Sequence, residues 1–137
     1  MEDFKPTYNR MDYILLVEDE VSMQELMKDL LESNGYNVLI ANDGFEALET
    51  YRQKGDMISL VVLDVMLPEM DGRDTYWELK KINENVKAFF CTGFASLVEI
   101  QSLTEKENLY AIQKPFSPKE FLAVVKEVLS DEPRVGY

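Results

Sequence analysis

Short apolar runs alternate along the chain with longer segments in which apolar residues recur at helical spacing. The runs are rich in aliphatic, aromatic and β-branched residues. Several are apolar at every position, as expected for strands that helices cover on both faces. The five runs are Tyr13–Val17, Tyr36–Ala41, Ile58–Leu63, Val86–Cys91 and Leu109–Ile112. We expect each of them to form one strand of a buried sheet.

Two of the intervening segments have the clearest helical pattern. The first carries a single apolar stripe with the spacing i, i+3, i+4, i+7, i+8. Its members are Met23, Leu26, Met27, Leu30 and Leu31. The last segment, from Phe121 onwards, has a complete start signal. Ser117 can cap the helix, Pro118 suits its first position and Glu120 completes a capping box.

Weaker patterns predict three further helices. Asn42 or Asp43 could cap the second helix of the chain. The third should begin after Asp71-Gly72, where the glycine serves a turn. The fourth is expected over about Ser96–Lys106, where the amphipathic pattern is poorest. Together with the two clear segments, these patterns predict five helices.

Five strands that alternate with five helices indicate consecutive βαβ units, and therefore a parallel sheet with right-handed crossovers. We predict an α/β fold with a doubly wound (βα)5 parallel five-stranded sheet in the flavodoxin-like order 2-1-3-4-5. One domain is expected over residues 13–130, between an N-terminal tail at 1–12 and a C-terminal tail at 131–137.

Composition and charge narrow the classes of function. The 137 residues include 14 Lys and Arg against 26 Asp and Glu, a formal net charge of −12. A negative field of this size repels phosphate backbones and anionic membranes, so neither nucleic-acid binding nor membrane insertion is expected. The sequence contains no His. This excludes a histidine general base, a His-ligated zinc site and a phosphohistidine carrier.

Cysteine usage and the apolar runs indicate a compartment. The single cysteine, Cys91, cannot form an internal disulfide and fits a reducing environment. Residues Met1–Met11 lack the apolar core of a signal peptide. The apolar runs are far shorter than the roughly 20 residues that a spanning helix needs. We therefore expect a cytoplasmic protein.

Ionisable and hydroxyl side chains follow the predicted strands at the edge where parallel sheets bind ligands. Glu18 and Asp19 follow the first strand, Asp64 the third, Thr92 the fourth and Lys114 the fifth. Clustered carboxylates without His or Cys favour a hard, oxygen-seeking cation such as Mg²⁺, for which Mn²⁺ could substitute. A metal ion and a lysine would attract a phosphoryl group. Asp64, at the centre of the sheet, is then the best-placed nucleophile for an aspartyl phosphate.

Each of these residues also has a structural interpretation. Asp19 could cap the helix that follows it. Lys114 could only neutralise Asp64 in an ion pair, and Thr92-Gly93 could be an ordinary turn. Their joint occurrence at the ends of successive strands favours a site over these separate explanations.

Four motifs, taken in this order, resemble the receiver domain of two-component response regulators. They are Leu-Val-Glu-Asp-Glu (16–20), Leu-Asp-Val-Met-Leu-Pro-Glu-Met-Asp-Gly (63–72), Cys-Thr-Gly-Phe (91–94) and Lys-Pro-Phe (114–116). Each motif alone is weak, but four on the predicted strands are specific. The resemblance extends over residues 12–130 and implies a receiver-like fold.

The resemblance implies a phosphoacceptor and a metal site. Asp64 would accept the phosphoryl group and also bind Mg²⁺. Asp19 would bind the metal directly and Glu18 through water, and the backbone carbonyl of Met66 would complete the protein ligands. Glu18 stands where Asp is commoner, which should alter the metal geometry without abolishing binding.

The resemblance also implies a switch. Lys114 would contact the phosphoryl group, Thr92 would move toward it, and the bond between Lys114 and Pro115 would be cis. Receivers often carry a switch aromatic three residues before the lysine, where this chain has Ala111. Tyr110 is one residue earlier and should point to the other face of the strand, so it cannot take the place of that aromatic.

The function that follows is a phosphoacceptor module of a phosphorelay rather than an enzyme, with autophosphorylation and autodephosphorylation as its only reactions. A histidine kinase or its phosphotransfer domain would supply the phosphoryl group. The face of the fourth helix, fifth strand and fifth helix would then change for an unknown downstream protein. Met66 and Phe94 are expected to flank the approach of water and to slow hydrolysis of the aspartyl phosphate.

Three other functions compete with this one. An Mg²⁺-dependent phosphohydrolase with an aspartyl-phosphate intermediate would need a second acid near Asp64 and a substrate cap, which the sequence lacks. A flavodoxin-like cofactor binder would need a phosphate loop, where Glu18-Asp19-Glu20 is repulsive. A phosphorylation-independent pseudo-receiver would not need the complete site. The motifs leave open a stand-alone receiver, a fragment of a larger regulator, or part of a hybrid histidine kinase, with a lean toward the last.

Overall fold

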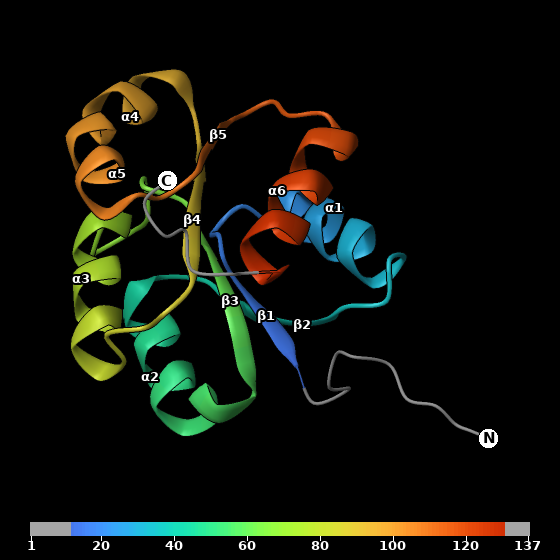
Figure 1. The fold of residues 1–137 in the computed structure, drawn as a ribbon, viewed down its shortest axis with the longest axis horizontal. Helices are drawn as coiled ribbons and strands as arrows, with labels where there is room; N and C mark the ends of the chain where they lie inside the picture. Colours follow the sequence, from blue (N-terminus) through green and yellow to red (C-terminus); the bar gives the residue numbers. More distant parts are fainter. Residues whose placement is uncertain (1–11, 131–137) are drawn as a thin grey trace.

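The computed structural model describes residues 12–130 (Figure 1). Apart from Asp12, the predicted tails at 1–12 and 131–137 lie outside the described residues. The described part forms one five-stranded sheet with helices on both faces.

All neighbouring strands of the sheet are parallel, in the order β2-β1-β3-β4-β5. The strands are β1 (Tyr13–Val17), β2 (Asn37–Ala41), β3 (Ile58–Leu63), β4 (Ala88–Thr92) and β5 (Ala111–Gln113). This confirms the predicted doubly wound α/β fold and its strand order. β4 begins two residues later than predicted, at Ala88, and ends one residue later, at Thr92, which pairs with Gln113 of β5.

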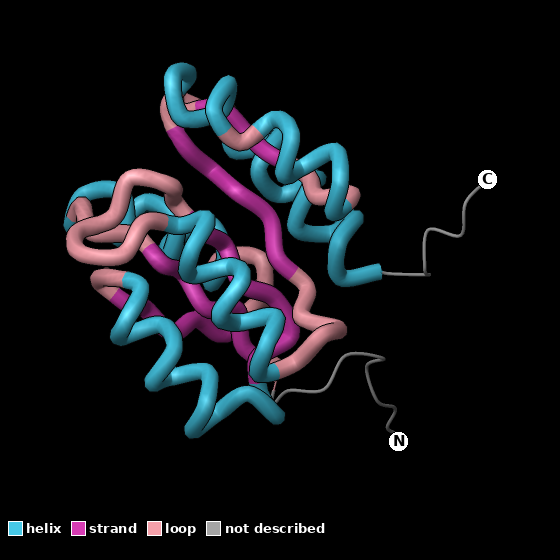
Figure 2. The backbone as a smooth tube through the Cα atoms, turned by 90° about the vertical axis from the view of Figure 1, so that its left-hand side faces the viewer, coloured by secondary structure: helices cyan, strands magenta, loops and turns pink. Residues whose placement is uncertain are grey.

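Helices cover the sheet in two layers, α1 and α6 on one face and α2 to α5 on the other (Figures 1 and 2). Figure 2 is turned so that the second layer faces the viewer. The helices are α1 (Val21–Glu32), α2 (Gly44–Lys54), α3 (Gly72–Ile82), α4 (Phe94–Glu99), α5 (Gln101–Glu107) and α6 (Pro118–Ser130), with a 3-10 turn η1 (Gly55–Met57).

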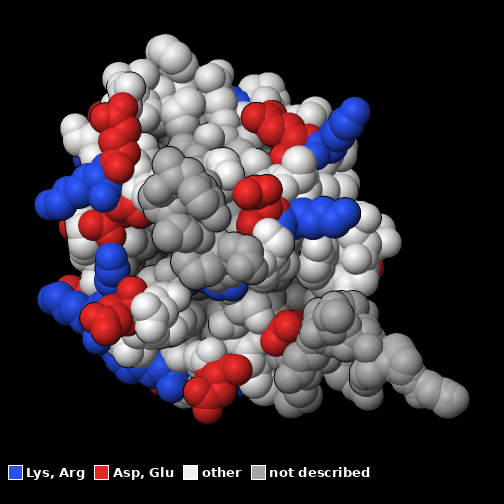
Figure 3. All heavy atoms as spheres, viewed as in Figure 1, with Lys and Arg blue, Asp and Glu red and all other residues white. Residues whose placement is uncertain are grey.

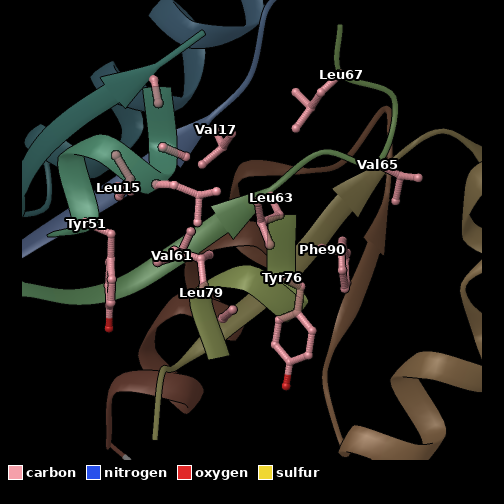
Figure 4. Close-up of a cluster of buried hydrophobic side chains, with 14 of the residues drawn as sticks. Leu15, Val17, Tyr51, Val61, Leu63, Val65, Leu67, Tyr76, Leu79 and Phe90 are labelled. Atoms are coloured by element: carbon pink, nitrogen blue, oxygen red, sulfur yellow. The ribbon is translucent and has the colours of Figure 1, made fainter. Parts of the chain in front are cut away.

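Alternation along the strands divides the core into two apolar clusters, one under each helix layer. In β3, Val61 and Leu63 face α2 and α3, whereas Leu60 and Val62 face α1 and α6. Figure 4 shows the first cluster, in which Tyr76 of α3 packs beside the central strands. Because both faces of β3 are buried, its carboxyl end is held in a fixed position.

Polar side chains cap three of the helices, two of them (Asp43 and Ser117) at predicted positions and the third at Asp71, which was not predicted as a cap. The carboxylate of Asp43 accepts a hydrogen bond from the backbone N–H of Glu46 at 2.7 Å, and Asp71 accepts two from the first turn of α3. The hydroxyl of Ser117 accepts one from the N–H of Glu120 at 3.0 Å. These bonds satisfy N–H groups that have no partner within the helix.

The buried face of α1 differs from the predicted stripe. Its buried residues are Gln24, Met27 and Leu31, whereas Leu26, placed in the stripe by its spacing, is 46% exposed. The prediction of Leu26 as a buried residue was therefore wrong. The helix turns a polar residue inward because Gln24 finds hydrogen-bond partners there.

The fourth helix predicted over 96–106 is two short helices, α4 and α5, which meet at Ile100. The backbone of Ile100 leaves the helical region (φ −95°, ψ 6°), and its side chain is fully buried in the cluster under α2 and α3. The change in direction therefore occurs at the residue of this segment that is buried in the core.

Glu107 joins α5 to α3. One oxygen of its carboxylate, Oε1, accepts hydrogen bonds from the Tyr76 hydroxyl at 2.9 Å and from the Lys80 ammonium at 2.5 Å. The bond from Lys80 lowers the pKa of Glu107. The two donors fix the second of the short helices against α3.

The surface carries both signs of charge. On the face shown in Figure 3, acidic and basic side chains of the described residues interleave, mostly along its left-hand side. Within residues 12–130, no helix combines the length and the apolar composition needed to cross a membrane.

Candidate functional site

Residues from four adjacent strands meet at the carboxyl edge of the sheet. Glu18 follows β1, Asp64 follows β3, Thr92 ends β4 and Lys114 follows β5. Backbone hydrogen bonds between neighbouring strands continue past the strand ends. The N–H of Asp64 donates to the carbonyl of Val17, and the N–H of Lys114 donates to the carbonyl of Thr92. The structure thus brings together the side chains that the sequence places at the strand ends.

Lys114 lies between two carboxylates. Its ammonium donates to Oε1 of Glu18 at 2.5 Å and to Oδ2 of Asp64 at 2.9 Å. Burial lowers the pKa of Lys114, but the hydrogen bonds that its ammonium donates to Glu18 and Asp64 outweigh this effect, and the pKa is raised. The lysine therefore stays charged and balances part of the negative charge of the site.

Both oxygens of Asp64 accept hydrogen bonds. Oδ2 accepts from Lys114, and Oδ1 accepts from the hydroxyl of Thr92 at 2.7 Å and from the backbone N–H of Met66 at 3.3 Å. The residue is 8% exposed and Thr92 is 1% exposed. The resemblance implies that Thr92 moves to a phosphoryl group, and in the structure its hydroxyl already lies at the carboxylate.

The two acids after β1 differ in their surroundings. Glu18 is 2% exposed, and burial raises its pKa, which the hydrogen bond from Lys114 partly offsets. Its other oxygen accepts from the N–H of Glu20 at 3.0 Å. Asp19 is exposed and forms no hydrogen bond or ion pair with any other described residue. The helix cap position is Glu20, so Asp19 is not a cap.

The acidic cluster fits a hard divalent cation. One carboxylate oxygen each from Glu18, Asp19 and Asp64 lies within 4.8 Å of the others. Lys114 contacts two of these acids, Glu18 and Asp64, and the donor set is made of oxygen atoms, the set that Mg²⁺ prefers. Asp19 is exposed, so its carboxylate is accessible to an ion from solvent. Metal binding by the Met66 carbonyl remains a prediction.

Two exposed apolar residues flank the site in sequence. Met66, two residues after Asp64, is 71% exposed, and Phe94, two residues after Thr92, is 64% exposed. Both lie in the segments that leave the carboxyl ends of β3 and β4. Their proposed effect on water remains a prediction.

The residues before Lys114 lie on opposite faces of the sheet. Ala111 packs against the cluster under α2 to α5, and Tyr110 packs against the cluster under α1 and α6. Tyr110 therefore does not take the place of an aromatic at position 111, as expected from strand alternation. The peptide bond from Lys114 to Pro115 is cis.

Sequence reasoning missed the role of two residues at the site. Gln24 contacts the loop after β1, and a polar residue on an apolar helix stripe could have signalled it. Gly72 was expected to serve a turn, but it is the first residue of α3 and lies against the backbone of Asp64. A Cβ at this position would lie 2.0 Å from the Asp64 carbonyl oxygen and 2.9 Å from the Cα of Val65.

We expect Gly72→Ala to lower the free energy of unfolding by about 3 kcal/mol, because its neighbours are backbone atoms that cannot rotate away. Any shift that relieves the clash also displaces Asp64. Thermal denaturation measures the loss. The matched control is Gly55→Ala, where the nearest atom to a new Cβ is 3.6 Å away and no loss is expected. Equal stability of the Gly72→Ala variant and the wild type would contradict the close approach.

Comparisons with known proteins agree with this geometry. A family model described as response regulator receiver domain matches residues 14–126. The chain is 37% identical over 119 residues to the sensor kinase CckA of Brucella abortus, and 34% identical over 119 residues to the transcriptional regulatory protein CpxR of Escherichia coli. Each alignment covers 87% of this chain, but only 13% of CckA and 50% of CpxR.

A solved structure shares the fold. The non-phosphorylated HemR receiver domain from Leptospira biflexa superimposes with a TM-score of 0.78 at 34% sequence identity. The match covers 92% of this chain and 99% of that one.

Proposed function

The chain belongs to the response regulator receiver domain family, and from this we propose that Asp64 is the phosphoacceptor of a two-component phosphorelay. The observation that carries the proposal is the Asp64 carboxylate, which is held by Thr92, Lys114 and the N–H of Met66 beside the unengaged Asp19. These donors suit a phosphoryl group, because they can bond its oxygens as they now bond the carboxylate.

In the proposed transfer, a carboxylate oxygen of Asp64 attacks the phosphorus atom of a phosphohistidine. A P–O bond forms, the P–N bond breaks, and its electron pair returns to the imidazole of the donor protein. Hydrolysis removes the phosphoryl group again. Water attacks the phosphorus atom, the P–O bond to Asp64 breaks, and inorganic phosphate leaves while the Asp64 carboxylate is regenerated. The donor is a histidine kinase or its phosphotransfer domain, because this chain contains no His.

Glu18, Asp19, Asp64 and the carbonyl of Met66 would hold Mg²⁺, with Mn²⁺ as a substitute. When bound, the ion offsets negative charge on the transferred phosphoryl group. The residues of the chain provide the rest. Lys114 supplies a fixed positive charge on the β5 side of Asp64, and Thr92 supplies a hydroxyl donor from β4.

The effect of phosphorylation on a downstream protein is also a proposal, because the chain spans only 13% of CckA and 50% of CpxR. We propose that phosphorylation changes the face formed by α4, α5, β5 and α6, and that a downstream protein reads this change. Thr92 and Lys114 flank this face from the ends of β4 and β5. The net charge of −12 argues against nucleic acid as its direct partner.

Incubation with acetyl phosphate and Mg²⁺, followed by intact mass measurement, tests the function. The proposal requires one added phosphoryl group, its absence in EDTA, and its release by hydroxylamine, which cleaves acyl phosphates. An adduct that forms equally well in EDTA would contradict the metal requirement. If neither acetyl phosphate nor a phosphorylated histidine kinase produced an adduct, the phosphoacceptor function would be overturned.

Autodephosphorylation gives a further prediction. We propose that Phe94 and Met66, exposed beside the site, restrict the approach of water. Phe94→Ala should then shorten the lifetime of the phosphoprotein severalfold, because it opens the path to phosphorus. The decay of the adduct in Mg²⁺, after acetyl phosphate has been removed, measures the lifetime. Phe45→Ala, which removes an exposed phenylalanine from α2, is the control. A short wild-type lifetime that Phe94→Ala does not shorten further would contradict this role.

A further inference from the structure

Gln24 is a buried polar residue on the face of α1 that otherwise enters the apolar core. It is 8% exposed, and the buried residues that follow it on this face are Met27 and Leu31. Its side-chain nitrogen donates to the backbone carbonyl of Glu18 at 2.6 Å and to Oδ1 of Asn42 at 2.7 Å. Both hydrogens of the amide nitrogen are thereby used, so its position is fixed from two sides.

The hydrogen bonds between Asn42 and Glu46 determine the orientation of the side-chain amides of Asn42 and Gln24. Oε1 of Glu46 accepts from the backbone N–H of Asn42 at 2.6 Å and from its side-chain nitrogen at 3.0 Å. Because a carboxylate only accepts, the nitrogen of Asn42 must face Glu46 and its oxygen must face Gln24. The side-chain nitrogen of Gln24 therefore faces two acceptors, and an inverted amide would lose both bonds.

The carbonyl of Glu18 belongs to the peptide bond that joins Glu18 to Asp19. Its partner therefore sets the position of the backbone from which the Asp19 side chain projects. Asp19 itself makes no hydrogen bond with any described residue, so its own side chain does not fix it. Lys114 and the N–H of Glu20 hold the Glu18 carboxylate, and Gln24 holds the carbonyl behind it.

We propose that Gln24 is a positioning residue for the metal site: it anchors the loop after β1 to the loop after β2, and so holds the Asp19 carboxylate where a divalent cation binds. This inference rests on the proposed function. Without this anchor, the Asp19 carboxylate loses conformational freedom only when the ion binds. That loss of entropy weakens binding of the ion. Loss of a residue that orients a metal ligand typically lowers affinity 10–100-fold.

Titration calorimetry with MgCl₂ on the full chain tests the proposal through binding alone, without phosphorylation. Gln24→Met keeps the length of the side chain and removes its donor. We expect its Kd for Mg²⁺ to rise about 10-fold at a temperature where circular dichroism shows both proteins folded. A merely structural role would lower the melting temperature but leave this Kd unchanged. Gln53→Met is the matched control, because Gln53 bonds Glu49 on the exposed side of α2.

Glu46→Ala keeps the test decisive if Gln24→Met does not fold. It frees Asn42 at the exposed end of the chain of bonds and removes no buried atom, so a smaller rise in the Kd is expected. Unchanged Kd values in the folded variants would overturn the proposal. Asp19→Asn distinguishes failure of the role of Gln24 from failure of the metal site itself. If it weakens Mg²⁺ binding while Gln24→Met and Glu46→Ala do not, only the role of Gln24 fails. If the wild type binds no Mg²⁺, the metal site and the role of Gln24 both fail.

Discussion

Asp64→Asn is expected to leave a folded domain that takes up no phosphoryl group. An amide at this position has the shape of the carboxylate and still offers an oxygen to Thr92 and to the N–H of Met66. The amide nitrogen would face Lys114, donor against donor, which costs one hydrogen bond but leaves the core intact. The variant nevertheless lacks the anionic oxygen that attacks phosphorus. Intact mass after incubation with acetyl phosphate and Mg²⁺ measures the loss.

The matched control for this variant is Asp74→Asn. Asp74 is an exposed aspartate in the first turn of α3, and its side chain has no part in the site. The Asp74→Asn variant should take up a phosphoryl group to the same extent as the wild type. A full adduct on folded Asp64→Asn would show that another residue accepts the phosphoryl group.

Lys114→Met is expected to slow phosphorylation about 100-fold, the usual effect of removing one donor aimed at developing negative charge. It should also lower the free energy of unfolding by about 2 kcal/mol at pH 7 without Mg²⁺. Glu18 and Asp64 would then face each other in a buried site without their cation. Rates from intact mass and melting curves with and without Mg²⁺ measure the two effects.

The pH and metal dependence of Lys114→Met follow from the same charges. Burial raises the pKa of Glu18 above its usual value of 4.5, and loss of Lys114 raises it further. The folded state then holds a proton that the unfolded state releases, so stability falls as the pH rises above about 4.5. The variant should be more stable at pH 5 than at pH 7, and Mg²⁺ should restore part of the loss.

Lys119→Met, on the exposed surface of α6, is the control and should change neither quantity. If Lys114→Met were phosphorylated at the wild-type rate, the assigned contact between Lys114 and the phosphoryl group would be wrong.

The strands and the acids at their ends were predictable because each depends on local sequence. A run such as Leu60–Leu63 is apolar on both faces, which fixes β3 as a central strand and places Asp64 at its carboxyl end. The caps at Asp43 and Ser117 were predictable for the same reason, since a cap needs only the residues of one turn.

The features that sequence reasoning missed depend on contacts between distant segments. Spacing alone favoured Leu26 as a buried residue, whereas α1 buries Gln24 because its amide bonds the Glu18 carbonyl and Asn42, a residue 18 positions further along the chain. The break at Ile100 coincides with the burial of its side chain among residues from other elements, which the local pattern does not reveal. Gly72 is required by the backbone of Asp64, a contact that a reading of Asp71-Gly72 as a turn does not contain.

The most direct test of Asp64 as the phosphoacceptor is chemical mapping of the modified residue. Borohydride reduces an aspartyl phosphate to homoserine, and unmodified aspartate does not react. After phosphorylation, reduction and proteolysis, fragment masses should place homoserine at position 64 alone, and none should form in the sample without a phosphoryl donor. Homoserine at any other aspartate, with position 64 unchanged, would contradict the account.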